Sequence, residues 1–337
     1  MNYFQKYLAE EFAEDYQEGR LNRRQAIKLI SSVTGSVVMA TSILAACGPR
    51  EAPTQIAFPG GTATPTATFQ PPTPPDTLTE EPPVDESPTG TARPSPQAQV
   101  QGTVSVDDPA LEAKAISLEG VGATLMGYQA VPKGSGPFPV VLVCHENRGL
   151  TPYIQDVTRR LAKAGYAALA VDLLSRQGGT SALSADQIPG ALGNTNPDQF
   201  VQDFLSGWQY LQKQSFAQAR KVGMVGFCFG GGVTWLVATR MPELRAAVPY
   251  YGPLPPVADV PKIQAAVLAF YGGKDTRING GIPPVEEAMQ KNGKIFEKVI
   301  YPDADHAFHN DTGPRYNPEA AQDAWKRTLD WFRRYLD

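Results

Sequence analysis

The stretch that decides the fold lies at residues 222–231 and reads VGMVGFCFGG. Its apolar start is typical of a buried strand, and the residues after it fit a helix. A sharp strand-to-helix turn strains the backbone, and side chains two positions either side would clash, which explains Gly226 and Gly230. The following helix points its N-terminus at Cys228 and favours the thiolate. The pattern predicts a nucleophilic cysteine; the alternative is a buried structural cysteine at a glycine-rich junction.

Strands and helices alternate on both sides of this turn. Residues 139–144 and 166–171 are continuous apolar runs, as expected of parallel strands buried on both faces. Apolar residues at helical spacing predict helices over 154–164, 199–212 and 319–336. This alternation predicts an α/β fold with a mostly parallel central sheet and helices on both faces.

An acid and a base follow two later strands. Asp275 comes just after the strand predicted at 265–271, and His306 just after the strand predicted at 296–301. Residues at the carboxyl ends of parallel strands converge at one edge of the sheet, so both should lie near Cys228. His309 is a competing base, but it lies further from its strand end, and we therefore prefer His306.

Several segments together identify a family. They are GFCFGG at 226–231, GGKD at 272–275 and HAF at 306–308, with shorter matches at 165–168, 172–173 and 250–252. With these segments the chain resembles the dienelactone hydrolase family over nearly all of residues 110–337. The resemblance implies the α/β-hydrolase fold and a carboxylic ester hydrolase that uses neither metal nor cofactor. It implies Cys228 as nucleophile, His306 as base and Asp275 as the residue that orients His306.

The loop after the strand at 139–144 reads HENRG and covers residues 145–149. A loop at this place can supply the second backbone N–H of an oxyanion hole. The resemblance implies that Asn147 and Phe229 donate these two N–H groups, and that Glu146 holds or activates the thiol at rest. The alternative for Glu146 is a solvated loop carboxylate.

The chain departs from the family where the substrate's carboxylate would bind. The family uses two arginines, but one of their positions holds Asn310, and residues 177–212 contain neither Arg nor Lys. Arg148 and Arg176 remain as possible cations. We therefore expect neutral esters or lactones to be preferred over carboxylate-bearing ones, unless another cation has taken over the clamp.

The N-terminal region resembles a bacterial export signal. Arg23 and Arg24 precede an uncharged run that ends in the lipobox-like sequence LAAC at residues 44–47. The expectation is a signal over residues 1–47, a lipidated Cys47, and a mature protein anchored on the extracytoplasmic face of a bacterial membrane. One departure is the acidic lead from Glu10 to Glu18. The alternative is an uncleaved membrane anchor with Cys47 as a bystander.

Composition divides the rest of the chain and excludes some functions. Residues 48–105 are rich in Pro and Thr and predict a disordered tether, and residues 106–337 hold the hydrolase-like domain. The net charge of −4 argues against a nucleic-acid partner. Only 3 Cys and 3 His occur, which argues against a zinc centre or a disulfide scaffold.

The predicted function is hydrolysis of an ester or lactone bond of a small molecule through a Cys-His-Asp triad and a thioester intermediate. The membrane would be a partner only through the lipid anchor. The alternative is a non-catalytic lipoprotein of the same fold that binds a small ligand. A redox-sensing thiol protein is disfavoured because no Cys-x-x-Cys pair is present. The sequence sets neither the natural substrate nor the oligomeric state.

Overall fold

A computed structural model describes residues 1–46 and 102–337, which belong to one compact unit. Cys47 and nearly all of the predicted tether at 48–105 lie outside the described residues. Within the described ranges, no helix has both the length and the apolar character needed to cross a membrane.

The centre of the fold is an eight-stranded sheet with the order β1-β2-β4-β3-β5-β6-β7-β8. The hairpin β1–β2 and the pair β2–β4 are antiparallel, and the other neighbours are parallel. The predicted mostly parallel sheet is therefore confirmed. The strands are β1 (Leu111–Gly120), β2 (Ala123–Pro132), β3 (Phe138–Cys144), β4 (Ala167–Val171), β5 (Ala217–Phe227), β6 (Ala246–Tyr250), β7 (Ala266–Gly272) and β8 (Phe296–Tyr301).

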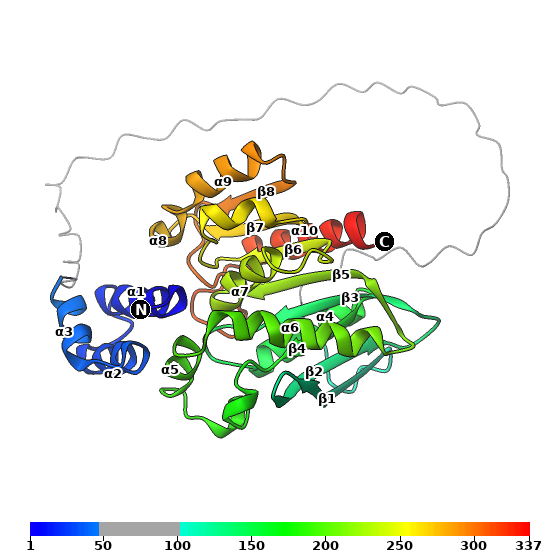
Figure 1. Ribbon diagram of the computed structural model, residues 1–337, viewed down its shortest axis with the longest axis horizontal. Coiled ribbons are helices and arrows are strands. Elements are labelled where there is room, and N and C mark those ends of the chain that lie inside the picture. The colour runs from blue at the N-terminus through cyan, green and yellow to red at the C-terminus, as the bar shows by residue number, and fades with distance from the viewer. Residues whose placement is uncertain (47–101) are drawn as a thin grey trace, which may run out of the picture. The chain divides into compact units, whose positions relative to one another are not determined.

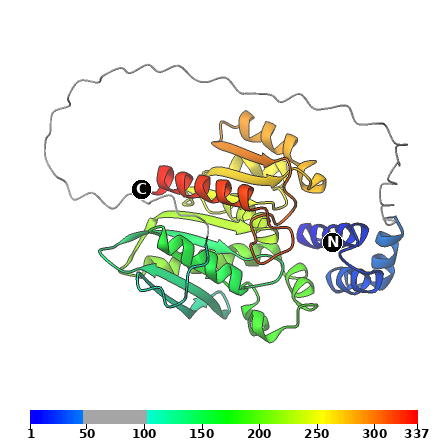
Figure 2. The ribbon, with the colours of Figure 1, turned by 180° about the vertical axis from the view of Figure 1, so that it is seen from behind.

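Helices cover both faces of this sheet. Helices α6 and α7 lie in front of it in Figure 1, and α4 and α10 come to the front when the molecule is turned in Figure 2. Gly223 of β5 lets α10 approach closely, since a Cβ there would lie 2.9 Å from the Phe332 ring. The helices are α1 (Tyr3–Gln17), α2 (Arg23–Thr34), α3 (Val37–Ala46), α4 (Pro152–Lys163), α5 (Ile188–Gly193), α6 (Pro197–Gln212), α7 (Phe229–Ala238), α8 (Thr276–Asn279), α9 (Ile282–Lys291) and α10 (Pro318–Leu336).

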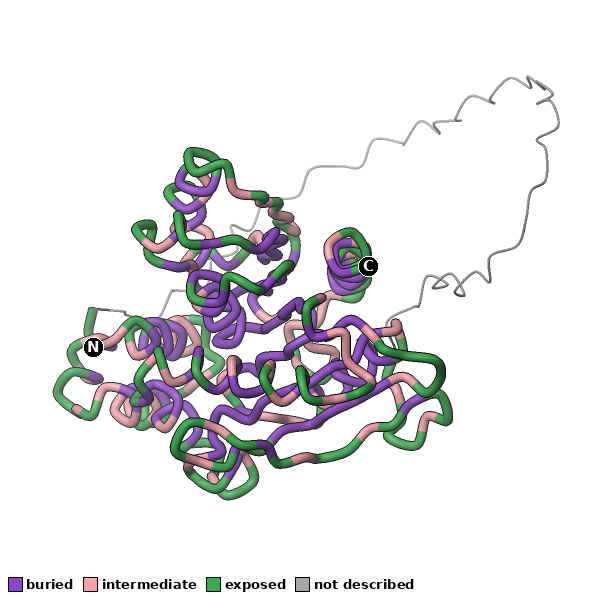
Figure 3. The backbone as a smooth tube through the Cα atoms, turned by 45° about the vertical axis from the view of Figure 1, so that its right-hand side comes forward, coloured by how far each residue is buried: buried purple, intermediate pink, exposed green. Residues whose placement is uncertain are grey.

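The parallel strands form the buried core. Strands β4, β6 and β7 are buried along their whole length, and buried segments run through the middle of the molecule in Figure 3. Continuous burial accounts for the unbroken apolar runs of their sequences. Because the strands run parallel, the carboxyl ends of β3, β5, β7 and β8 meet at one edge of the sheet, where polar loop residues gather.

Residues 1–46 form three helices that join the core. Asn2 and Asn22 each accept a hydrogen bond from the backbone three residues on, and Gln5 and Gln25 reach back to complete two capping boxes. Buried apolar residues of α1, α2 and α3 belong to the same hydrophobic cluster as the sheet. The segment that resembles an export signal thus packs on the hydrolase domain in this structure.

Candidate active site

Cys228 sits on the sharp turn predicted between β5 and α7. Its φ of 56° lies in the left-handed region, which a residue other than glycine rarely adopts. A Cβ at Gly226 would lie 2.1 Å from the carbonyl oxygen of Gly230, and one at Gly230 would lie 2.4 Å from that of His145. Both glycines are therefore required by the close approach of backbone to backbone, as the spacing predicted.

Asp275 and His306 meet across the ends of β7 and β8. The Nδ1 atom of His306 lies 2.6 Å from Oδ2 of Asp275, and both side chains are buried. Burial alone would lower the pKa of His306, but the Asp275 carboxylate and Cys228 raise it well above its usual value. Nε2 of His306 forms no hydrogen bond with the described residues. One nitrogen is thus held by the acid, and the other is available on the Cys228 side.

His309, the competing base, is used elsewhere. Its Nδ1 atom lies 2.6 Å from the hydroxyl of Tyr153, and its ring packs 5.1 Å from that of Phe227. Burial lowers the pKa of His309 well below its usual value. The structure therefore brings His306, and not His309, to the predicted acid.

The predicted oxyanion loops flank Cys228. Phe229 is the first residue of α7, and Asn147 follows β3 in the loop beside it. Across the described chain, neither amide donates to another backbone group in a loop or turn. The Oε2 atom of Glu146 accepts a hydrogen bond of 2.8 Å from Nδ2 of Asn310, and its role at the thiol stays a prediction. Burial raises the pKa of Glu146 to about 6.

Helix α1 supplies two side chains that the sequence did not predict for this site. The hydroxyl of Tyr7 lies 3.2 Å from Sγ of Cys228, and both carboxylate oxygens of Glu11 lie 3.7 Å from it. Oε1 of Glu11 also accepts from Nδ2 of Asn147 at 3.2 Å and lies 3.9 Å from Nε2 of His306. Cys228 is left only 3% exposed. Burial and the Glu11 carboxylate raise the pKa of the thiol, which disfavours the thiolate.

Two arginines beside the site were also missed. Arg277 pairs with Glu14 at 3.0 Å, and Arg315 lies 3.7 Å from Asp15, so both face acidic residues of α1. Arg176, which the sequence left as a candidate, is bound to both oxygens of Asp203 at 2.8 Å. The preference for a neutral substrate stays a prediction, and Arg277 and Arg315 are further cations near the site that could receive a carboxylate if α1 left.

One group of side chains at the site has the chemistry of a metal site. A ligand atom from each of Glu11, Cys228 and His306 lies within 4.8 Å of the others. A cation held there would occupy both the thiol and the base, and it would require α1 to be in place. The three residues are equally accounted for by a docked helix, without an ion.

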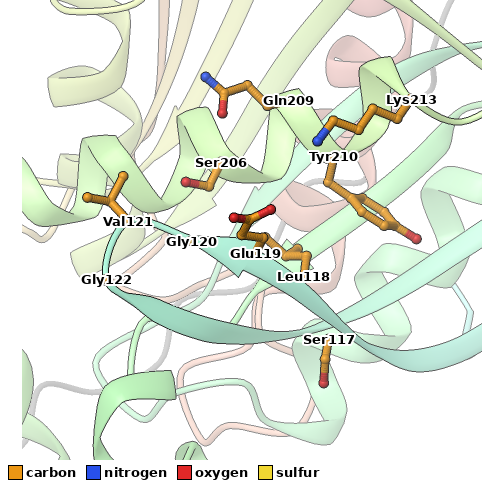
Figure 4. A pocket seen from close by; sticks show the side chains of 10 residues that line it. All are labelled: Ser117, Leu118, Glu119, Gly120, Val121, Gly122, Ser206, Gln209, Tyr210 and Lys213. Atoms are coloured by element: carbon orange, nitrogen blue, oxygen red, sulfur yellow. The ribbon is translucent and has the colours of Figure 1, made fainter.

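The hollow in Figure 4 lies away from this site. It is bordered by β1, the β1–β2 turn and α6, with the side chains of Glu119, Gln209, Tyr210 and Lys213 along its wall. None of the residues predicted for the chemistry lines it. Its position therefore gives it no part in chemistry at Cys228.

Comparison with known proteins decides the family. The model of the dienelactone hydrolase family matches residues 125–336. The chain belongs to the dienelactone hydrolase family. This hydrolase is 39% identical over 248 residues to a protein of Methylorubrum extorquens named "Putative carboxymethylenebutenolidase"; the match spans 70% of this chain and 85% of that protein. An Escherichia coli protein of the same name is 33% identical, with 69% and 90% covered.

A solved structure gives the same result. The crystal structure of a "Putative Dienelactone Hydrolase" from Klebsiella pneumoniae is 33% identical, with a TM-score of 0.64. The superposition covers 67% of this chain and all of that one. The family match begins at Leu125, so α1 lies outside the matched region. The hydrolase domain is shared with these relatives, and the residues of α1 over the thiol lie outside what the family model describes.

Proposed function

We propose that this hydrolase cleaves carboxylic esters or lactones through Cys228, His306 and Asp275. The observation that carries the proposal is the Asp275–His306 pair beside a cysteine on a strained strand-to-helix turn. Nucleophile, base and orienting acid within reach of one another form the arrangement that acyl transfer needs.

The reaction has two steps. Sγ of Cys228 attacks the acyl carbon while His306 takes the thiol proton, and the amides of Asn147 and Phe229 stabilise the oxyanion. His306 then protonates the alkoxide as its bond to the acyl carbon breaks, which leaves a thioester on Cys228; the alcohol departs from an ester and stays attached to the acyl chain of a lactone. Water attacks the thioester, again with His306 as base, and releases the acid and the free thiol. Asp275 keeps His306 in the tautomer that presents Nε2.

A panel of activated esters and lactones tests this function. Hydrolysis that depends on Cys228 supports it, and hydrolysis that survives the loss of the thiol contradicts it. Because α1 covers the thiol in the structure, the panel is run on the wild type and on Phe4→Asp, which places a charge in the apolar contact of α1 with Phe229.

The charge of the preferred substrate gives a separate prediction. Nη2 of Arg277 is buried without a hydrogen-bond partner among the described residues, so it can receive a substrate carboxylate once α1 has left. In the Phe4→Asp background, Arg277→Gln should lower kcat/KM for a carboxylate-bearing lactone by about tenfold or more, and leave a matched neutral lactone little changed. The control is Arg334→Gln, at an exposed arginine of α10. A preference for the neutral lactone before any arginine is changed would agree with the prediction from sequence and contradict this role of Arg277.

Export and lipidation remain part of the proposal. The support is the twin arginine and the lipobox-like LAAC ending at Cys47. After expression in a bacterium, intact-mass analysis of membrane-extracted protein should find a lipidated Cys47 at the N-terminus and no residues 1–46. Cys47→Ala is the control and should keep its N-terminus. Recovery of unmodified full-length wild type from the membrane would overturn this assignment.

A further inference from the structure

We propose that helix α1 is an intramolecular inhibitor of the hydrolase, which covers Cys228 so that the site opens only when α1 leaves. That α1 inhibits turnover rests on the proposed function, but that α1 covers Cys228 does not. In this role α1 is a ligand of the active site that the chain itself provides.

One face of α1 makes the contacts around Cys228. Phe4, Tyr7, Glu11 and Glu14 follow one another at steps of three or four residues, which places them on the same side of a helix. Phe4 is fully buried, with its ring 4.7 Å from that of Phe229, next to the nucleophile. Lys6 and Glu10 lie off this face and are exposed.

The middle of this face occupies the place of a substrate. The Glu11 carboxylate lies against the thiol and the Asn147 side chain, with His306 on its other side. An acyl group must reach the same three neighbours to react. With Cys228 3% and His306 3% exposed, the helix leaves no room for one.

The ends of the helix are held separately. At its start, Nδ2 of Asn2 donates to the Gly193 carbonyl oxygen at 2.9 Å, and Nε2 of Gln5 donates to Oδ1 of Asn194 at 2.9 Å. At its other end, Glu14 pairs with Arg277, whose guanidinium also lies 4.9 Å from the Tyr7 ring centre. Such contacts at both ends fix α1 across the site.

The covering helix lies outside the part of the chain that the family model matches. The family match begins at Leu125, and the Klebsiella pneumoniae structure matches only 67% of this chain. Residues 47–101 separate α1 from the hydrolase domain along the chain. Processing at Cys47, as predicted from the lipobox, would remove α1 together with α2 and α3. One cut would then release both the export signal and the inhibitor.

The test measures how fast iodoacetamide alkylates Cys228 in the full-length chain, with peptide mapping to assign each cysteine. Two variants weaken the docking at different places: Phe4→Asp in the apolar contact and Glu14→Arg at the ion pair. Each should speed alkylation of Cys228 by about tenfold or more, because a buried contact becomes an unpaired charge or a repulsion. Cys144, which is fully buried in β3, should stay unmodified and reports on the integrity of the fold.

Matched controls make the result specific. Glu10→Arg introduces the same change of charge on the exposed side of α1 and should leave the rate unchanged. Combining Glu14→Arg with Arg277→Glu restores an opposite-charge pair and should return alkylation toward the wild-type rate. Wild-type alkylation as fast as that of both variants, or a fast double variant, would overturn the inference.

Ester hydrolysis is followed in the same samples. A rise in kcat/KM that parallels the alkylation rate is the expected result. Faster alkylation with no hydrolysis in any variant would support α1 as the cover of Cys228 and contradict the proposed function. If Cys228 is alkylated at the same rate in the wild type and in both variants, and the wild type hydrolyses the ester, the proposed function is supported and the inhibitory role of α1 is contradicted.

Discussion

Cys228→Ala should abolish ester hydrolysis, with a loss in kcat of about a thousandfold or more. The change removes only the sulfur atom. Its φ of 56° strains alanine as much as cysteine, and the glycines that permit the turn are unchanged, so the turn should persist. The measurement is steady-state hydrolysis of an activated ester with and without Cys228→Ala, in the full-length wild type and in its Phe4→Asp variant.

Cys144→Ala is the matched control for this prediction. It deletes the same atom from a thiol that is fully buried at the end of β3, one residue before the oxyanion loop. It should lower the free energy of unfolding by about 1 kcal/mol and leave kcat nearly unchanged. Loss of activity in both variants alike would point to a general effect on folding, and turnover that survives in Cys228→Ala would remove Cys228 from the reaction.

His306→Ala should be nearly as damaging as the loss of the thiol. In the proposed reaction the imidazole carries the proton in both steps, and its partner Asp275 would be left as a buried carboxylate without its hydrogen bond. Members of a triad act as a unit, so Cys228→Ala combined with His306→Ala should be no worse than either change alone. The check is kcat for the two single variants and the double variant in one background.

His309→Ala separates chemistry from packing. His309 is as buried as His306, but it bonds Tyr153 instead of the acid. Its loss leaves the buried Tyr153 hydroxyl without that partner and should destabilise the fold by about 1–3 kcal/mol. Activity per folded molecule should fall by less than about threefold. A larger fall in kcat for His309→Ala than for His306→Ala would make His309, and not His306, the catalytic base.

The hydrolase domain could be predicted from sequence because its constraints are local. A nucleophile between two glycines at 226 and 230 permits few backbones, and an acid and a base at successive strand ends converge in any parallel sheet. The same logic separated His306 from His309 by their distance from the end of β8.

The contacts of α1 could not be predicted in this way. Nothing in a sequence states that residues 4–14 lie against Cys228, more than two hundred positions away, because that contact depends on the packing of whole elements. Two signals were present: an amphipathic spacing through Phe4, Tyr7 and Glu11, and an acidic lead unusual for an export signal. Both were outweighed by the twin arginine and the LAAC sequence. Arg277 and Arg315 were also missed, because neither stands where the family has its two arginines.

In the proposed reaction, Cys228 carries the acyl group during turnover. The most direct measurement is acid quenching of the Phe4→Asp chain within the first turnover of an activated acetate ester, followed by mass spectrometry of its peptides. We predict one acetyl group, on the peptide that contains Cys228 and on neither Cys144 nor a serine, and no adduct after Cys228→Ala. Turnover of the ester with no acyl adduct on Cys228, or with the adduct on another side chain, would contradict the account.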